Sequence, residues 1–287
     1  MQERAMSAAG AIVYWSPAEH SDGAKLREGL TAAGFEAFAP EARPAEAVLR
    51  DALECTVASP TMLVRPLDKG VKGFVVVQEN RDSQVNEYEA LFTTIMRPGG
   101  TDYQTTCLCD AGNDVLNQYG CAIRERWAAL QDAFRPAQVS GCLVKVLGAL
   151  AGIRLRPQGA IYWLPAGVLE LWGKVMSAVE QAAFVGESAR MYMVRTAMDA
   201  DTVRAVHDAI VAEAKTEADT IDAEVMGGTL GARALSTRVT TAKNLRTKIK
   251  LYESILGTSL ADLSVTVEKV EVAAAMAAMA AAADKGA

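Results

Sequence analysis

Two apolar repeats near the carboxyl end constrain this chain more than any other feature. The first extends from Val203 to Val225 and the second from Leu235 to Leu256, each with apolar residues three and four positions apart. This spacing places them on one face of a helix. Between them lies Gly227-Gly228-Thr229-Leu230-Gly231, whose glycines favour a break. The pattern predicts a long helical hairpin, an antiparallel coiled coil, over residues 199–257.

The two helices of this hairpin carry opposite charge. Residues 201–224 contain seven acidic and two basic residues, whereas residues 229–252 contain six basic residues and no acidic one. Antiparallel pairing would bring Glu213 near Arg246. Exposed ion pairs contribute only about 0.2 to 1 kcal/mol each, so we expect them to set the pairing register more than to add stability.

A third helix with an Ala- and Met-rich tail is predicted over residues 258–287, where Ser259 can cap its start. The tail has high helix propensity but little to bury unless something packs on it. The sequence therefore favours a non-catalytic interaction protein that self-associates or docks a protein partner through its C-terminal helices. The residues expected to make this contact are Leu260, Leu263, Val267, Val270, Met276 and Met279.

Residues 1–198 show a different pattern, in which short β-rich runs alternate with helical segments. Phe35–Ala39 is one predicted strand, and residues 61–109 predict an antiparallel meander. Residues 10–39 and 159–196 begin with similar strands, which indicates either a duplicated strand-helix-strand unit or the chance recurrence of an aromatic strand before a helix. The expected fold class is α+β, with a mixed N-terminal domain and a C-terminal helical hairpin.

Composition excludes several broad classes. No stretch reaches the roughly 18 to 20 apolar residues of a membrane span. The amino end lacks the pattern of a secretory signal, so we expect a cytoplasmic protein. The five cysteines leave at least one thiol unpaired, which favours free, mostly buried thiols. A net charge of −6 argues against general binding of polyanions.

Nucleic-acid binding is the first alternative. It would use a hairpin in which basic and aromatic residues alternate, together with the basic second helix, because basic side chains contact phosphates and aromatic faces stack on bases. Pairing with the acidic helix would explain the same basic residues without a ligand. The candidates are Arg154, Arg156, Tyr162, Lys243, Arg246 and Lys250.

An enzyme with a site near His20 is the second alternative, because a loop histidine can act in acid–base chemistry. A solvated loop residue explains His20 equally well, and His207 is expected to be a structural contact. Phosphate-binding motifs are absent from the sequence. The spacing of Cys107, Cys109 and the later cysteines does not fit a zinc motif. We therefore expect no catalytic residues, no metal site and no cofactor.

One segment carries a family resemblance. Leu155-Arg156-Pro157-Gln158-Gly159-Ala160-Ile161-Tyr162-Trp163-Leu164-Pro165, with the later helical pair and Leu251-Tyr252, resembles an uncharacterised family found in phages, plasmids and their bacterial or archaeal hosts. The likeness covers roughly residues 60–270 and omits the Ala-Met tail. It implies a mobile-element origin and transfers no catalytic residue.

Overall fold

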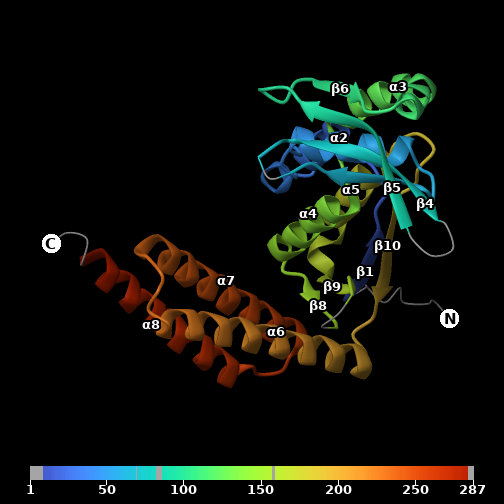
Figure 1. The fold of residues 1–287 in the computed structure, drawn as a ribbon. Helices are drawn as coiled ribbons and strands as arrows, with labels where there is room; N and C mark the ends of the chain where they lie inside the picture. The colour runs from blue at the N-terminus through green and yellow to red at the C-terminus, as the bar shows by residue number, and fades with distance from the viewer. Residues whose placement is uncertain (1–8, 69, 82–85, 157–158, 284–287) are drawn as a thin grey trace, which may run out of the picture. The chain divides into compact units, whose positions relative to one another are not determined.

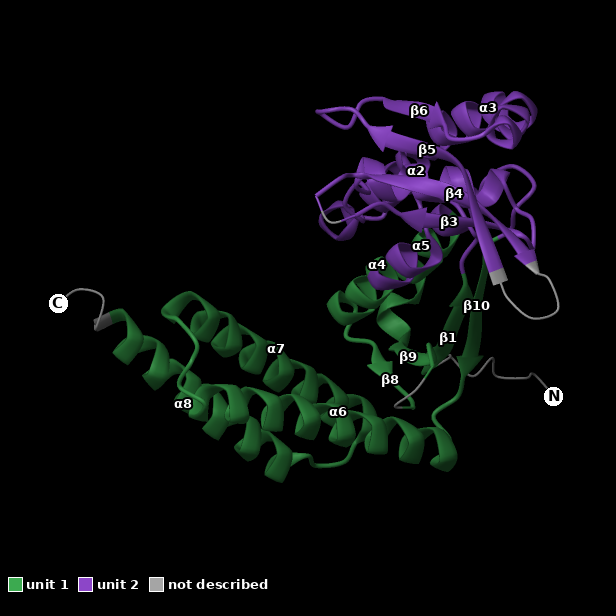
Figure 2. Cartoon of the chain, viewed as in Figure 1, with its two compact units in different colours: residues 1–16, 142–177, 189–287 green, residues 17–141, 178–188 purple. Residues whose placement is uncertain are grey.

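The computed structural model describes residues 9–68, 70–81, 86–156 and 159–283 (Figure 1). It confirms the α+β class, with antiparallel sheets followed by C-terminal helices. The chain forms two compact units (Figure 2). Unit 1 comprises residues 1–16, 142–177 and 189–287, and unit 2 comprises residues 17–141 and 178–188. Unit 1 therefore includes residues on both sides of the boundary predicted at residue 198.

Unit 1 contains a four-stranded sheet in the order β10-β1-β9-β8. The strands are β1 (Gly10–Ser16), β8 (Ile153–Arg154), β9 (Tyr162–Pro165) and β10 (Arg190–Thr196), all paired antiparallel. Central β1 buries Ala11 and Val13, as expected from its apolar, β-rich sequence. The two segments of similar sequence thus become neighbours, because β1 pairs with β9 from Gly10 opposite Pro165 to Val13 opposite Tyr162.

Three long helices complete unit 1: α6 (Ala200–Met226), α7 (Ala232–Leu256) and α8 (Ala261–Ala283). Asp199 caps α6 by accepting a hydrogen bond from the backbone N–H of Thr202 at 2.8 Å. Gly257 ends α7 with a φ of 63°, a conformation that favours glycine. The break at residues 227–231 occurs as predicted, and Figure 1 shows the three helices side by side.

These helices bury one continuous apolar core. It joins their inward faces to Ile153 and Trp163 of the sheet. Its fully buried members include Val206, Ile210, Ala214, Ile221, Ala242, Ile249, Tyr252, Val267 and Ala274. The third helix is therefore part of this core rather than an appendage to a two-helix hairpin.

Charge pairs link α6 with α7, but in a register that differs from the predicted one. Glu213 accepts a hydrogen bond from Lys248 Nζ at 2.5 Å, and Glu224 pairs with Arg238. Arg246, the expected partner of Glu213, instead contacts Glu268 and Glu271 of α8. The difference arises because α8 packs along α7 and supplies its own carboxylates.

Unit 2 contains the predicted antiparallel meander. Its strands are β3 (Met62–Pro66), β4 (Gly73–Arg81), β5 (Asn86–Met96) and β6 (Tyr103–Cys107), in sequence order. Helices α2 (Ala45–Thr56) and α3 (Asp110–Leu130) share an apolar core with this sheet. Phe74, Val76, Leu91 and Phe92 of the sheet meet Leu49, Leu53, Val115 and Ile123 of the helices in that core.

The remaining elements include two short strands, three helices and two helical turns. They are β2 (Ser21–Asp22), α1 (Gly23–Ala32), η1 (Glu36–Phe38), β7 (Ala133–Phe134), α4 (Pro136–Ala149), η2 (Ala166–Val168) and α5 (Leu169–Gln181). The strand predicted at residues 35–39 is wrong, because Phe38 and Ala39 donate their backbone N–H groups to carbonyls three residues earlier and form the helical turn η1.

Candidate functional site

A buried histidine organises a polar site in unit 2. His20 lies in the loop between β1 and β2, and its backbone N–H donates a hydrogen bond to Glu187 Oε2 at 2.6 Å. The other oxygen of this carboxylate, Oε1, lies 2.9 Å from His20 Nδ1. The Phe184 ring packs near the imidazole, with ring centroids 5.8 Å apart. One carboxylate therefore holds both the backbone and the ring of His20.

Arg135 fixes the protonation pattern of this imidazole. Its Nη1 lies 3.0 Å from His20 Nε2, and a guanidinium can only donate hydrogen bonds. Nε2 must therefore be the acceptor, and the ring proton lies on Nδ1, where it is donated to Glu187. In this arrangement the Nε2 lone pair accepts from Arg135 and is directed away from Glu187.

Further charges surround Arg135. Its Nη1 lies 3.4 Å from Glu19 Oε1, and its Nε lies 3.5 Å from Asp51 Oδ2. Asp51 also accepts a hydrogen bond from Arg43 Nη2 at 2.5 Å, and both of these side chains are largely buried. The network therefore alternates carboxylates with guanidinium groups and ends at His20.

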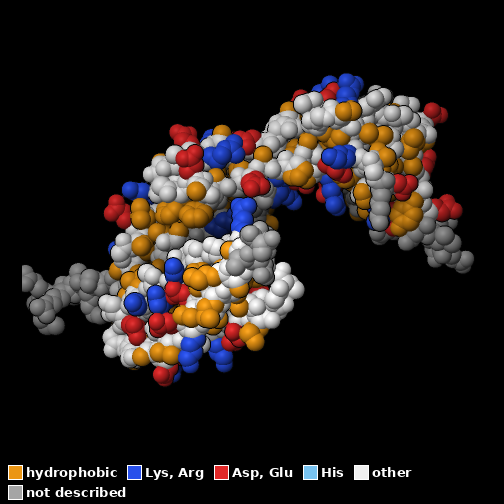
Figure 3. Space-filling view, turned by 90° about the vertical axis from the view of Figure 1, so that its left-hand side faces the viewer, with side chains coloured by type: hydrophobic (Ala, Val, Ile, Leu, Met, Phe, Trp, Pro, Cys, Tyr) orange, Lys and Arg blue, Asp and Glu red, His pale blue; other side chains and the backbone are white. Residues whose placement is uncertain are grey.

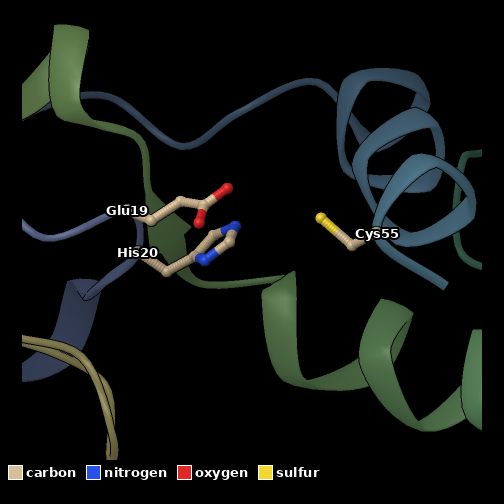
Figure 4. A group of neighbouring side chains, drawn as sticks. All are labelled: Glu19, His20 and Cys55. Carbon is tan, nitrogen blue, oxygen red and sulfur yellow. The ribbon is translucent and has the colours of Figure 1, made fainter. Parts of the chain in front are cut away.

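A pocket of about 470 Å³ opens beside this network. Glu19, His20 and Glu187 contribute to its wall, as does Cys55 from the last turn of α2. Ligand-forming atoms of Glu19, His20 and Cys55 all lie within 4.8 Å of one another. Figure 4 shows the Cys55 thiol facing a ring nitrogen of His20, with the Glu19 carboxylate alongside. The pocket therefore combines a thiol, an imidazole and carboxylates, a donor set suited to a cation or to proton transfer.

The hairpin residues considered for nucleic-acid binding contact each other. Arg154 Nη2 donates to the Tyr162 hydroxyl at 2.9 Å, and its guanidinium carbon lies 5.4 Å from the ring centroid. Tyr162 is buried and stacks on Trp15 with centroids 5.4 Å apart, whereas Arg156 is exposed. The tyrosine therefore has no open face on which a base could stack.

The basic residues of α7 also include both paired and exposed side chains. Arg246 is paired with two carboxylates of α8, whereas Lys243 and Lys250 are exposed. On the face of the molecule in Figure 3, Lys and Arg side chains are interspersed with Asp and Glu side chains. That face therefore carries no uniformly basic surface of the kind that binds nucleic-acid backbones.

The residues considered for partner contact separate into two groups. Leu260, Val267 and Val270 are buried in the core of unit 1, and Leu263 is partly buried against it. Met276 and Met279 are exposed. The α8 surface open to a partner therefore differs from the face that fills the bundle.

A second cavity, of about 670 Å³, lies in unit 1 between α6 and the start of α8. His207, Val211 and Lys215 line one side, and Leu260 and Leu263 line the other. His207 Nδ1 lies 3.2 Å from the neighbouring Asp208 carboxylate. His207 therefore lies at the edge of a groove lined by both apolar and charged side chains.

The five cysteines are all free, as expected. Only Cys142 is buried, so the expectation of mostly buried thiols is wrong. Burial raises the pKa of Cys142 to about 11, which keeps that thiol protonated at neutral pH. Cys107, Cys109 and Cys55 are partly exposed and Cys121 is exposed.

Comparison with known proteins gives one match. Residues 9–285 match the model of a family described as a family of unknown function, DUF6744. The match fits the expected resemblance to an uncharacterised family and extends it, since it includes the Ala-Met tail and the first strand. No curated protein and no solved structure matches the chain. Within the part of the chain that the structure describes, no helix has the length and apolarity to cross a membrane.

Proposed function

Because the chain belongs to DUF6744, a family of unknown function, we propose a function from the geometry of the molecule: it self-associates through α8. In this proposal the protein acts by assembly rather than by catalysis. The occupant of the exposed α8 surface is a second copy of the same chain.

The observation that carries this proposal is that α8 is apolar on two opposite faces. One face, with Val267, Val270 and Ala274, fills the core of unit 1. The other bears four large apolar side chains that are 50%, 53%, 67% and 73% exposed: Val265, Val272, Met276 and Met279. At about 100° per residue these four lie within roughly 60° of one another, opposite the buried face. A helix that is apolar on both sides is normally covered on both.

The spacing of this exposed stripe supports a helical partner. Val265, Val272 and Met279 recur every seven residues, with Met276 between the last two, whereas charged Glu268 and Lys269 lie between the first two. The alanines around them permit close approach of a second helix. The same stripe on two chains can pair about a twofold axis, which is the commonest symmetry of homo-oligomers.

Two further elements belong to this proposal. We infer a cytoplasmic site of action, supported by five free thiols, which fit a reducing compartment. We also infer a mobile-element origin, of phage or plasmid type, from the resemblance of residues 155–165.

Light scattering coupled to size-exclusion chromatography tests the assembly. The full chain should run as an oligomer, and the double variant V272E/M279E should run as a monomer, because charges in the stripe would be buried without partners. Met226→Glu is the matched control, since Met226 is also exposed but lies at the end of α6. A wild-type monomer over the accessible concentration range, or an oligomer unaffected by the double variant, would refute the proposal.

A further inference from the structure

We propose that Glu19, His20 and Cys55 form a binding site for a single zinc-like divalent cation. The site lies in unit 2, so the inference is independent of assembly through α8. Its proposed ligands are His20 Nε2, Cys55 Sγ and one carboxylate oxygen of Glu19. All three side chains line the pocket of about 470 Å³.

The donor set favours zinc over harder cations. Zinc binds thiolate sulfur, imidazole nitrogen and carboxylate oxygen, whereas magnesium and calcium prefer oxygen ligands. Ligand atoms around a tetrahedral zinc lie roughly 3.3 to 3.8 Å apart, given metal–ligand distances of about 2.0 to 2.3 Å. The corresponding atoms here lie within 4.8 Å of one another, and the Glu19 side chain is 64% exposed. Contraction of the three ligands around an ion therefore needs small movements, mainly of Glu19, together with displacement of the Arg135 guanidinium from His20 Nε2.

Glu187 prepares His20 for this role. By accepting the Nδ1 proton, it directs the Nε2 lone pair toward the pocket and fixes the orientation of the ring. Histidine ligands in metalloproteins commonly donate their other N–H to a carboxylate in this way.

Arg135 competes with the ion for the same acceptors. Its Nη1 lies 3.0 Å from His20 Nε2 and 3.4 Å from Glu19 Oε1, so the guanidinium faces two of the three ligands. A divalent ion must displace Nη1 from these atoms. Arg135 would keep its contact with Asp51, whose carboxylate lies 3.5 Å from Nε. Arg135 therefore lowers the affinity of the site for the divalent ion.

Three protein ligands leave a fourth coordination position in a tetrahedral site. Since the cluster lies on the wall of the pocket, this position can take water or a small anionic or neutral donor. The proposed site thus resembles the open class of zinc site rather than the closed structural class with four protein ligands.

Titration of the chelator-treated full chain with zinc, in competition with a chromogenic chelator, tests the site. We expect one ion per chain. In the cobalt-loaded protein, the thiolate-to-metal absorption should appear in wild type and disappear in C55S. Cys121→Ser is the matched control, because Cys121 is an exposed cysteine outside the cluster, and it should leave both signals unchanged.

Two further variants separate this proposal from a merely structural network. E187Q should weaken zinc binding about 10- to 100-fold. R135Q should strengthen it about tenfold or more, because it removes a positive charge adjacent to the ion. H20A should abolish zinc binding, and circular dichroism will report whether this variant folds. C55S tests the same site at a less buried residue. Absence of stoichiometric binding in wild type and R135Q alike, unchanged affinity in C55S, or weaker binding in R135Q would overturn the proposal.

Discussion

Glu187 binds His20 twice: one carboxylate oxygen accepts the backbone N–H at 2.6 Å and the other lies 2.9 Å from ring Nδ1. This contact ties the segment before α1 to the segment after α5, both in unit 2. Because His20 is buried, its two donors have few alternative acceptors. The pair is therefore a stability determinant as well as part of the pocket.

Glu187→Gln should lower the free energy of unfolding by about 1 to 2 kcal/mol, and Glu187→Ala by about 2 to 3 kcal/mol, since hydrogen bonds to charged groups are stronger than neutral ones. Glutamine keeps one acceptor oxygen but turns an NH₂ group toward the second donor. Urea denaturation followed by circular dichroism measures both. Glu170→Gln, at a highly exposed glutamate, is the control, and equal effects at positions 170 and 187 would contradict the argument.

Sequence periodicity predicted the elements whose signal is local. The helices at residues 200–256 and the strands from β3 to β6 follow from apolar spacing and glycine turns, because each pattern repeats within one segment. The exposed stripe of Val265, Val272 and Met279 was also readable as a seven-residue repeat. Sequence analysis selected residues on both faces of α8: Val267 and Val270 lie in the bundle core, whereas Met276 and Met279 belong to the exposed face.

The polar site could not be predicted in the same way. Sequence analysis singled out His20, but its partners Cys55, Arg135 and Glu187 come from distant segments with no shared motif. Only the folded chain places them around one imidazole. The failed strand at residues 35–39 has a similar explanation, since an apolar run of five residues does not by itself specify a pairing partner.

Gly112 permits α3 to pack closely against β5. A Cβ atom at this position would lie 2.0 Å from the carbonyl oxygen of Leu91, a backbone atom that cannot rotate away. We expect Gly112→Ala to destabilise the protein by about 1 to 3 kcal/mol through overpacking.

For Gly120 in the same helix, we expect substitution by alanine to have the opposite effect on stability. A Cβ atom there would have no neighbour within 4 Å, so Gly120→Ala should stabilise by about 0.5 to 1 kcal/mol through helix propensity alone. Thermal unfolding of the two variants gives the comparison. Shifts of the same sign would show that the contact with Leu91 is not what constrains Gly112.

Tyr252 anchors α7 to the segment before β8. Its hydroxyl donates to the Ala151 carbonyl at 2.8 Å, and its ring is fully buried beside Trp163. Tyr252→Phe should cost about 1 to 2 kcal/mol, because it leaves the Ala151 carbonyl without this donor. Tyr192→Phe, at a partly exposed ring, should cost almost nothing in the same urea titration. If Tyr252→Phe left the free energy of unfolding unchanged, water would have replaced the hydroxyl as the donor to the Ala151 carbonyl.

Cys142 of α4 should make stability sensitive to alkaline pH. Burial raises its pKa to about 11, while nearby Lys145 opposes the shift. An unfolded chain titrates cysteine near about 8.5. Because the folded pKa lies above the unfolded one, the stability that Cys142 contributes is fully present below about pH 8.5 and is lost as pH rises toward about 11.

Burial also raises the pKa of Tyr252, so the wild-type profile alone does not isolate the thiol. Urea midpoints of wild type and Cys142→Ala should therefore be compared across this range, with Cys121→Ala as control. The Cys142→Ala profile should be flatter, and parallel profiles for all three proteins would exclude Cys142 as a source of the alkaline loss.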